Sequence, residues 1–270
     1  MTDEEKIRQY KQMDGDGPGA PGELKYHYEG NQLAQAGKLA EAVSKWELSL
    51  KEAPSFVPTL YNLGVAYFQL RNFPKAATYF EKVQDLEPEH LEAHYGLGLV
   101  YLEEESYSKA QIAFKNVLVL NPNHAEAINN LGLILAQEQK FQEALEYFTK
   151  AIQVRPDYAD AYYNLGATQY ELGQFQEGSI SLRVALEIRP DHLMASHNLG
   201  LCYLRLGKYP EAEKVFLQVI NQEPDYLPTY FNLGLVYYHW KRYQNALLKF
   251  QEAKTKGFDN PLVQYNLGLV

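Results

Sequence analysis

Residues 57–90 read VPTLYNLGVAYFQLRNFPKAATYFEKVQDLEPEH, and the rest of the chain is built from variants of this stretch. Apolar residues follow one another at steps of three and four in each half: Leu60, Leu63 and Tyr67, then Ala76, Phe80 and Val83. That spacing places them on one face of a helix in each half. The stretch therefore predicts two short amphipathic helices.

The stretch recurs with a period of 34 residues. Six prolines keep this period: Pro54, Pro88, Pro122, Pro156, Pro190 and Pro224. Eight glycines keep it as well: Gly30, Gly64, Gly98, Gly132, Gly166, Gly200, Gly234 and Gly268. A fixed period of this length is typical of a solenoid, in which each repeat packs against its neighbours. An all-α fold built from helix pairs is therefore predicted.

The periodic glycine defines the domain organisation when each repeat is taken to begin seven residues before it. Seven full repeats follow, at 23–56, 57–90, 91–124, 125–158, 159–192, 193–226 and 227–260, with a partial eighth at 261–270. Residues 1–22 differ in kind: Thr2 and Glu5 are spaced as a capping box for a short helix, which the Gly- and Pro-rich linker DGDGPGAPGE follows.

Turn and cap residues agree with two helices per repeat. Residues suited to N-cap the first helices follow the prolines or the equivalent Phe258: Asn123, Asp157, Asp191, Asp225 and Asp259. Gly37, Gly173 and Gly207 share a position between the helices, where a left-handed C-terminal cap is expected. The periodic glycine lies mid-helix, which costs about 0.5–1 kcal/mol relative to alanine. Close approach of the second helix is the expected compensation.

These residues make the chain resemble the tetratricopeptide-repeat family. The family signature combines Leu-Gly-x-x-Tyr, Ala-x-x-x-Phe and a closing proline. It is complete, for example, in Leu63-Gly64, Tyr67, Ala76, Phe80 and Pro88, and again in Leu199-Gly200, Tyr203, Ala212, Phe216 and Pro224. The resemblance covers residues 23–270. It implies a right-handed superhelical solenoid of antiparallel helix pairs, with the first helices lining a concave surface.

Some repeats depart from the signature, and the repeat at 227–260 ends in Gly257-Phe258 rather than proline. The repeat at 159–192 has Gln169 for the tyrosine, Gly178 for the alanine and Leu182 for the phenylalanine, which makes it the candidate for a soft point. The first repeat has Glu29 where later repeats have leucine, as expected of a polar N-terminal capping repeat. The chain ends at Asn266-Leu267-Gly268-Leu269-Val270 with apolar residues last, so we expect either a longer natural protein or an end that docks on another surface.

Composition narrows the classes of partner. The formal net charge is −9, whereas nucleic-acid and anionic-membrane binding need clustered Lys and Arg. No apolar run is long enough for a transmembrane helix, and MTDEEKIRQY lacks the apolar segment of a signal peptide, so a cytoplasmic location is expected. Cys202 is the single cysteine, which excludes an internal disulfide and is interpreted as a small core residue.

No motif indicates catalysis, a metal or a cofactor. His90 and His94 are four residues apart, a spacing that suits two metal ligands on one helix face. However, His90, His124 and His192 share the last position of their repeats, which indicates a role in repeat architecture. No serine, histidine and carboxylate set is spaced as a triad. The array is therefore predicted to be non-catalytic, without cofactor or metal.

Asparagine recurs two residues before the periodic glycine. The row comprises Asn62, Asn130, Asn164, Asn198, Asn232 and Asn266, with Gly96 in the third repeat. On the helix order that the family implies, this row faces the groove and resembles the asparagine ladder of the O-linked N-acetylglucosamine transferase repeats. A carboxamide offers both a donor and an acceptor to peptide backbone. The alternative is a bond from each asparagine to a neighbouring helix, and both roles are compatible.

Neighbouring positions are expected to supply selectivity. The peptide-contacting candidates are the asparagine row together with Tyr163, Tyr170, His197, Phe231 and Tyr238. Aromatic side chains in a groove often dominate binding energy, although the same rings also serve helix packing. The carboxylate-clamp variety of the family is not expected, because His27, Glu92 and Gly96 replace its cations.

The sequence as a whole predicts an adaptor that binds a peptide segment of a partner protein in its groove. One alternative is the substrate-recruiting arm of a larger, glycosyltransferase-like enzyme. Another is self-assembly, in which the apolar C-terminal end stacks on the next copy.

Overall fold

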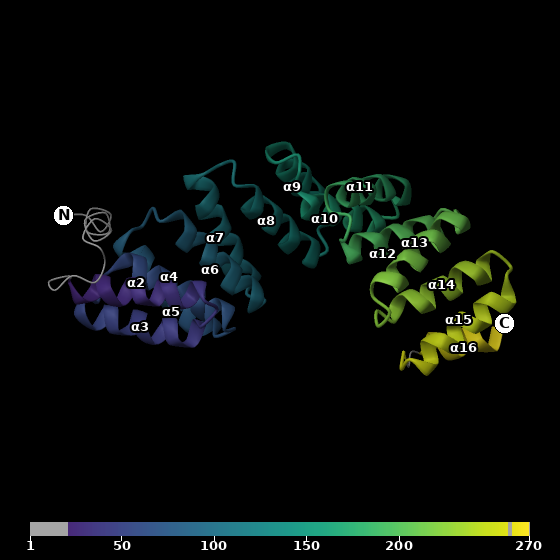
Figure 1. Ribbon diagram of the computed structural model, residues 1–270. Coiled ribbons are helices and arrows are strands. Elements are labelled where there is room, and N and C mark those ends of the chain that lie inside the picture. Colours follow the sequence, from purple (N-terminus) through teal and green to yellow (C-terminus); the bar gives the residue numbers. More distant parts are fainter. Residues whose placement is uncertain (1–20, 259–260, 270) are drawn as a thin grey trace. The chain divides into compact units, whose positions relative to one another are not determined.

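The computed structural model describes residues 21–258 and 261–269, which contain fifteen helices and no strand (Figure 1). The prediction of an all-α solenoid of helix pairs is therefore confirmed. The predicted short helix within residues 1–22 and the predicted cap Asp259 lie outside the described residues, apart from Pro21 and Gly22. No helix in the described ranges is both long enough and apolar enough to cross a bilayer.

First and second helices alternate along the chain. The first helices are α2 (Gly22–Gln35), α4 (Val57–Gln69), α6 (Leu91–Glu103), α8 (Ala125–Gln137), α10 (Ala159–Glu171), α12 (Leu193–Arg205), α14 (Pro228–His239) and α16 (Pro261–Leu269). The second helices are α3 (Leu39–Glu52), α5 (Phe73–Leu86), α7 (Tyr107–Leu120), α9 (Phe141–Val154), α11 (Phe175–Ile188), α13 (Tyr209–Gln222) and α15 (Tyr243–Thr255).

The helices form two compact units, Met1–Ala127 and Ile128–Val270, called here the N-terminal and C-terminal units. In the N-terminal unit, α3 contacts both α2 and α4, and α5 contacts both α4 and α6. In the C-terminal unit, α11 lies in the same way between α10 and α12, and α13 between α12 and α14. A second helix therefore joins its own repeat to the next, as expected of a solenoid.

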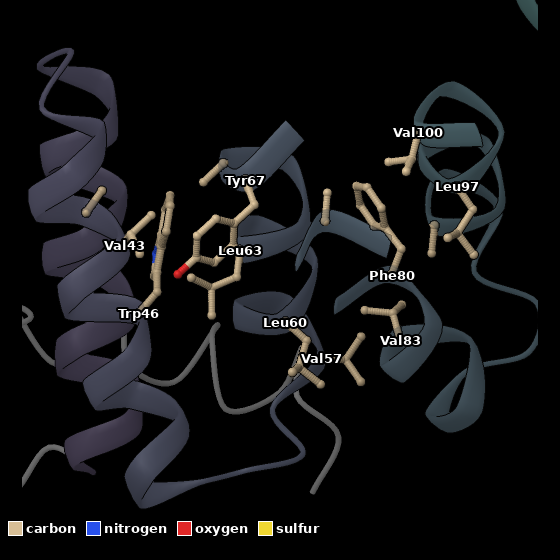
Figure 2. Packing of buried hydrophobic residues seen from close by; sticks show 14 of the residues in the cluster. Val43, Trp46, Val57, Leu60, Leu63, Tyr67, Phe80, Val83, Leu97 and Val100 are labelled. Carbon is tan, nitrogen blue, oxygen red and sulfur yellow. The ribbon is translucent and has the colours of Figure 1, made fainter. Parts of the chain in front are cut away.

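The periodic glycine lets a large side chain of the second helix touch the first helix. A Cβ on Gly64 would lie 2.7 Å from the ring of Phe80, and one on Gly132 would lie 2.7 Å from Phe148. The ring of Phe80 is buried between α4 and α6, where Figure 2 shows it beside Leu97 and Val100. The predicted close approach is confirmed, and it explains why glycine is kept inside a helix.

The turn between the two helices uses left-handed backbone. Gly37, Gly173 and Gly207 have φ of 75°, 76° and 70°, so the predicted C-terminal caps are confirmed. Where the sequence lacks glycine the backbone keeps this conformation, as at Arg71 and Gln139, whose φ values are 56° and 60°. The repeat geometry therefore imposes the turn even on residues that disfavour it.

The predicted N-caps Asp157, Asp191 and Asp225 are wrong, because the N-cap residues of α10, α12 and α14 are Tyr158, His192 and Leu227. In α6 and α12 the N-cap residues are His90 and His192, whose Nδ1 atoms accept from the backbone N–H three residues on, at 3.3 Å in both cases. Asp191 therefore lies one residue before the N-cap. The histidine ring also packs on the preceding first helix: His90 lies 5.2 Å from Tyr61, and His192 lies 4.8 Å from Tyr163, between ring centroids.

The three departures in the repeat at 159–192 form one packed set. Leu182 is fully buried and replaces the phenylalanine opposite Gly166. Gly178 lies close to its neighbours: a Cβ there would lie 3.0 Å from the Gly166 carbonyl oxygen and 3.3 Å from Cys202 Sγ. Gln169 accepts a 2.8 Å hydrogen bond from Ser181. These contacts compensate one another within the repeat.

We expect Gly178→Ala to destabilise the protein, although other repeats carry alanine at this position. Alanine gains about 1 kcal/mol of helix propensity, but overpacking against a backbone carbonyl and a buried thiol costs about 1–3 kcal/mol. A net loss of about 1 kcal/mol is expected in urea unfolding followed by circular dichroism. Gly268→Ala is the matched control, since nothing lies within 4 Å of its Cβ, and it should stabilise. Equal effects of the two changes would contradict the packing argument.

Candidate functional site

The C-terminal unit carries two adjoining hollows along its first helices. The smaller, of about 290 Å³, lies over α8, α9, α10 and α12. The larger, of about 650 Å³, lies over α10, α12, α14 and the turn that follows α12. Tyr170 and Leu201 line both, so the two hollows meet at α10 and α12.

Asparagines of the predicted row line these hollows. Asn164 and Asn198 border the smaller, and Asn232 borders the larger. Leu133, Ala167, Leu201 and Leu235, each one residue after a periodic glycine, supply apolar wall beside them. The structure thus brings together three of the six predicted asparagines on one hollowed surface.

Each of these three asparagines also reaches back to the side chain 35 residues earlier. Asn164 Nδ2 donates to Asn129 Oδ1 at 2.9 Å. Asn232 Nδ2 lies 3.2 Å from the Nε2 atom of His197, which accepts in the tautomer assigned below. Asn198 bonds to the Tyr163 side chain and so works against the effect of burial, which raises the pKa of that phenol. The row therefore links successive repeats, which was the structural alternative for these residues.

The other three asparagines have different surroundings. Asn62, in the N-terminal unit, donates to Asn31 Oδ1 at 2.9 Å and lines a separate hollow of about 450 Å³. Asn130 is buried. Asn266 is also buried, and its Nδ2 donates to the Leu262 carbonyl at 2.7 Å within α16. An amide offers two N–H groups and one carbonyl, so after one such bond an N–H and the carbonyl can still form further hydrogen bonds.

Two of the five predicted aromatic or histidine contacts reach the hollows. Tyr163 lines the smaller and is half-buried against His192. Tyr170 lines both, and its ring centroid lies 5.3 Å from that of Phe175. Tyr238 is half-buried and packs edge-on against Tyr243, 5.9 Å between centroids.

His197 and Phe231 lie in the interior instead. His197 is only 5% exposed, with its ring against Phe216 and Tyr226. Phe231 is 8% exposed and packs between Phe250 and Phe258. Tyr163 has the same repeat position but borders the smaller hollow, so the position alone does not decide which of these rings is buried.

Several groups at the larger hollow were not singled out from sequence. Arg205 and His239 lie seven residues after Asn198 and Asn232, and both line this hollow. Seven residues make about two helical turns, so Arg205 and His239 lie on the same helix face as the asparagines. This spacing was the sequence pattern from which they could have been predicted. The guanidinium of Arg205 lies 4.4 Å from the centroid of the Phe175 ring. Tyr209, from the start of α13, also lines the hollow.

His27 and His197 occupy the same repeat position and make the same contacts. The Nδ1 atom lies 2.8 Å from Thr59 Oγ1 in the first case and 3.1 Å from Thr229 Oγ1 in the second. In both, Nε2 faces an asparagine amide nitrogen, so Nε2 is assigned as the acceptor and Nδ1 carries the proton. Burial lowers the pKa of each imidazole from 6.5 to about 4.

We expect stability to fall as the pH drops from about 6.5 to about 4. Each histidine is neutral in the folded state over this range, whereas the unfolded chain takes up a proton below pH 6.5. A difference of about 2.5 pKa units corresponds to about 3 kcal/mol per histidine at the low end. His197→Gln should remove part of this pH dependence, measured as the urea midpoint at pH 7 and pH 4.5. The exposed His239→Gln is the control, and equal slopes for both variants would contradict the assignment.

Comparison with known families gives consistent matches along the chain. Models described as tetratricopeptide repeat match residues 61–111, 157–222 and 191–255, and one described as TPR repeat matches residues 132–173. Together these matches cover 61–111 and 132–255, more than half of the chain. A search of curated proteins finds no match to the sequence.

Solved structures share the fold. A tetratricopeptide repeat protein from Parabacteroides merdae ATCC 43184 is 18% identical, with a TM-score of 0.68 over 92% of this chain and 98% of its own. Cut9–Hcn1, from the APC/C hetero-tetramer, is 17% identical, with a TM-score of 0.73 over 97% of this chain and 51% of its own. YrrB, described as a TPR protein with an unusual peptide-binding site, is 26% identical, with a TM-score of 0.55 over 73% of this chain and 98% of its own.

Proposed function

The chain belongs to the tetratricopeptide-repeat family, and on that premise we propose that it is a non-catalytic scaffold for protein–protein interaction. A peptide segment of a partner protein lies along the first helices of the C-terminal unit. The observation that carries the proposal is the pair of adjoining hollows, which combine apolar walls with a row of asparagines. YrrB, which is described as having a peptide-binding site, is similar to this chain and supports the same use of the fold.

The asparagines hold peptide backbone in this proposal. Because Asn164 and Asn232 each use one N–H on the preceding repeat, the carbonyl and the second N–H of each amide are left for a ligand. Packed helices lie about 8–10 Å apart and an extended peptide rises about 3.3 Å per residue, so each amide meets roughly every third residue. At about 0.5–1.5 kcal/mol per hydrogen bond, the row gives a grip that tolerates many sequences.

Side chains of the peptide enter the two hollows. Tyr170 and Leu201 stand where the hollows meet and offer apolar surface to both. Partly buried aromatic groups of this kind are frequent binding hot spots. A role as the substrate-recruiting arm of a larger, glycosyltransferase-like enzyme requires the same surface and is a narrower version of this proposal.

We expect Leu201→Ser to weaken peptide binding about tenfold or more, because it places a hydroxyl where both hollows need apolar wall. The measurement is fluorescence anisotropy with peptides selected on the wild-type protein from a random display library. Leu201 is preferable to the asparagines as a target, since those amides also link the repeats.

Leu217→Ser is the matched control. Leu217 is an exposed leucine on the second helix α13 of the same unit. Circular dichroism establishes that both variants remain folded. If the two variants bind the selected peptides equally well, the hollows are not the binding surface, and if the library enriches nothing, the scaffold proposal loses its support.

Association of copies through α16 is a second candidate function. Leu262, Tyr265 and Leu269 share one face of this helix and are 54%, 65% and 46% exposed. Isolated exposed apolar side chains are common, but three on one helix face form a surface that association would bury. Such a contact between different surfaces continues from copy to copy.

We expect the weight-average mass to rise with concentration in sedimentation equilibrium, and Tyr265→Ser combined with Leu269→Ser to abolish that rise. Ile180→Ser on α11 is a control, because it removes an exposed apolar side chain elsewhere in the same unit. A wild-type protein that stays monomeric at high concentration would rule this association out.

A further inference from the structure

We infer that the larger hollow recognises an acidic side chain, Asp or Glu, of the bound peptide, and that Arg205 is the group that binds its carboxylate. The inference rests on the proposed function and specifies its ligand. The evidence for it is the set of groups that surround the Arg205 guanidinium and their charges.

Arg205 has no carboxylate partner among the described residues: the guanidinium contacts aromatic rings alone. Two other arginines of the C-terminal unit have acidic partners. Arg189 pairs with Asp160 through two bonds of 2.9 and 3.0 Å, and Arg242 lies 3.9 Å from a Glu213 oxygen. In the row seven residues after the asparagine positions, the C-terminal unit has Gln137, Glu171, Arg205 and His239. Arg205 is thus the one member of that row that is always positively charged.

The guanidinium is held in place before any ligand binds. It lies 4.4 Å from the Phe175 ring centroid and 5.9 Å from that of Tyr170. A cation over an aromatic face is stabilised by the ring without its N–H groups being consumed. Arg205 therefore keeps its fork of donors for a planar acceptor, and a carboxylate matches that fork with two parallel hydrogen bonds.

The rest of the larger hollow suits a peptide rather than a free ion. Asn232 offers an amide to the backbone, and Leu204 and Leu235 form apolar wall beside it. The hollow of about 650 Å³ has room for more than one side chain. An acidic residue next to an apolar one fits these groups.

The smaller hollow fixes where along the peptide the acidic residue lies. Its walls are mainly apolar, and the charged side chain that borders it is Glu171, which repels a carboxylate. The two hollows therefore differ in charge, with an apolar site at Glu171 followed by an anion site at Arg205. Nucleic acid is disfavoured as the source of the anion, since phosphate backbones bind clustered cations and this chain has a net charge of −9.

The test is selection from a random 12-residue peptide display library on the wild-type protein, on Arg205→Gln and on Arg205→Glu. We expect the wild type to enrich a motif with Asp or Glu at one fixed position, Arg205→Gln to lose that preference, and Arg205→Glu to prefer Lys or Arg there. Arg183→Gln is the matched control, because Arg183 is an exposed arginine on α11 of the same unit. It should keep the wild-type motif.

A double-mutant cycle then localises the contact. Replacing the selected Glu by Gln in a synthetic peptide should weaken binding to the wild type about tenfold and to Arg205→Gln hardly at all, as expected for one charge-assisted contact. If the enriched motif has no acidic position, or the two losses add, the Arg205 assignment is overturned while peptide binding that depends on Leu201 still stands. If no peptide is enriched, both the assignment and the proposed function are overturned.

Discussion

The contact of a periodic glycine with the large side chain of the second helix determines the distance between the two helices of a repeat. Without a Cβ on Gly64, the ring of Phe80 packs directly on the backbone of α4, and the same pair recurs as Gly132 with Phe148. Because this contact recurs from repeat to repeat, the next first helix meets each repeat in a similar register. A side chain two residues before the glycine then falls within hydrogen-bonding reach of the preceding repeat, as Asn164 does with Asn129.

The asparagine row can therefore both link successive repeats and bind a peptide. The bond to the preceding repeat satisfies one N–H of an amide that would be costly to bury unpaired. The same bond holds the amide in one orientation, which lowers the entropy that a peptide must overcome on binding. A row that served stacking alone would gain little from lining hollows, and a row that served binding alone would be poorly oriented. The observed hydrogen bonds and the positions beside the hollows fit a row that serves both.

The repeat architecture could be predicted from the sequence because it depends on period, and a 34-residue period is visible in Pro88, Pro122 and Gly98 without any structure. The left-handed turns and the glycine contacts could also be predicted, because the residues that form them recur at the same period. The N-caps could not be predicted in this way, because the capping histidines His90 and His192 also pack their rings on the first helix of their own repeat, at Tyr61 and Tyr163. The burial of His197 and Phe231 and the access to Arg205 depend on how each first helix is rotated, which the period does not specify.

The atypical repeat at 159–192 links packing to the candidate surface. Ala167 stands where neighbouring repeats have Leu133 and Leu201, and it borders the smaller hollow. A shorter side chain leaves room at that point, while Gly178 and Leu182 keep α11 close behind α10 and so preserve the core. The same repeat, which deviates most from the signature, also borders both hollows through Tyr170. A repeat protein that varies its concave side chains while holding its glycine contacts constant can change its ligand without changing its fold.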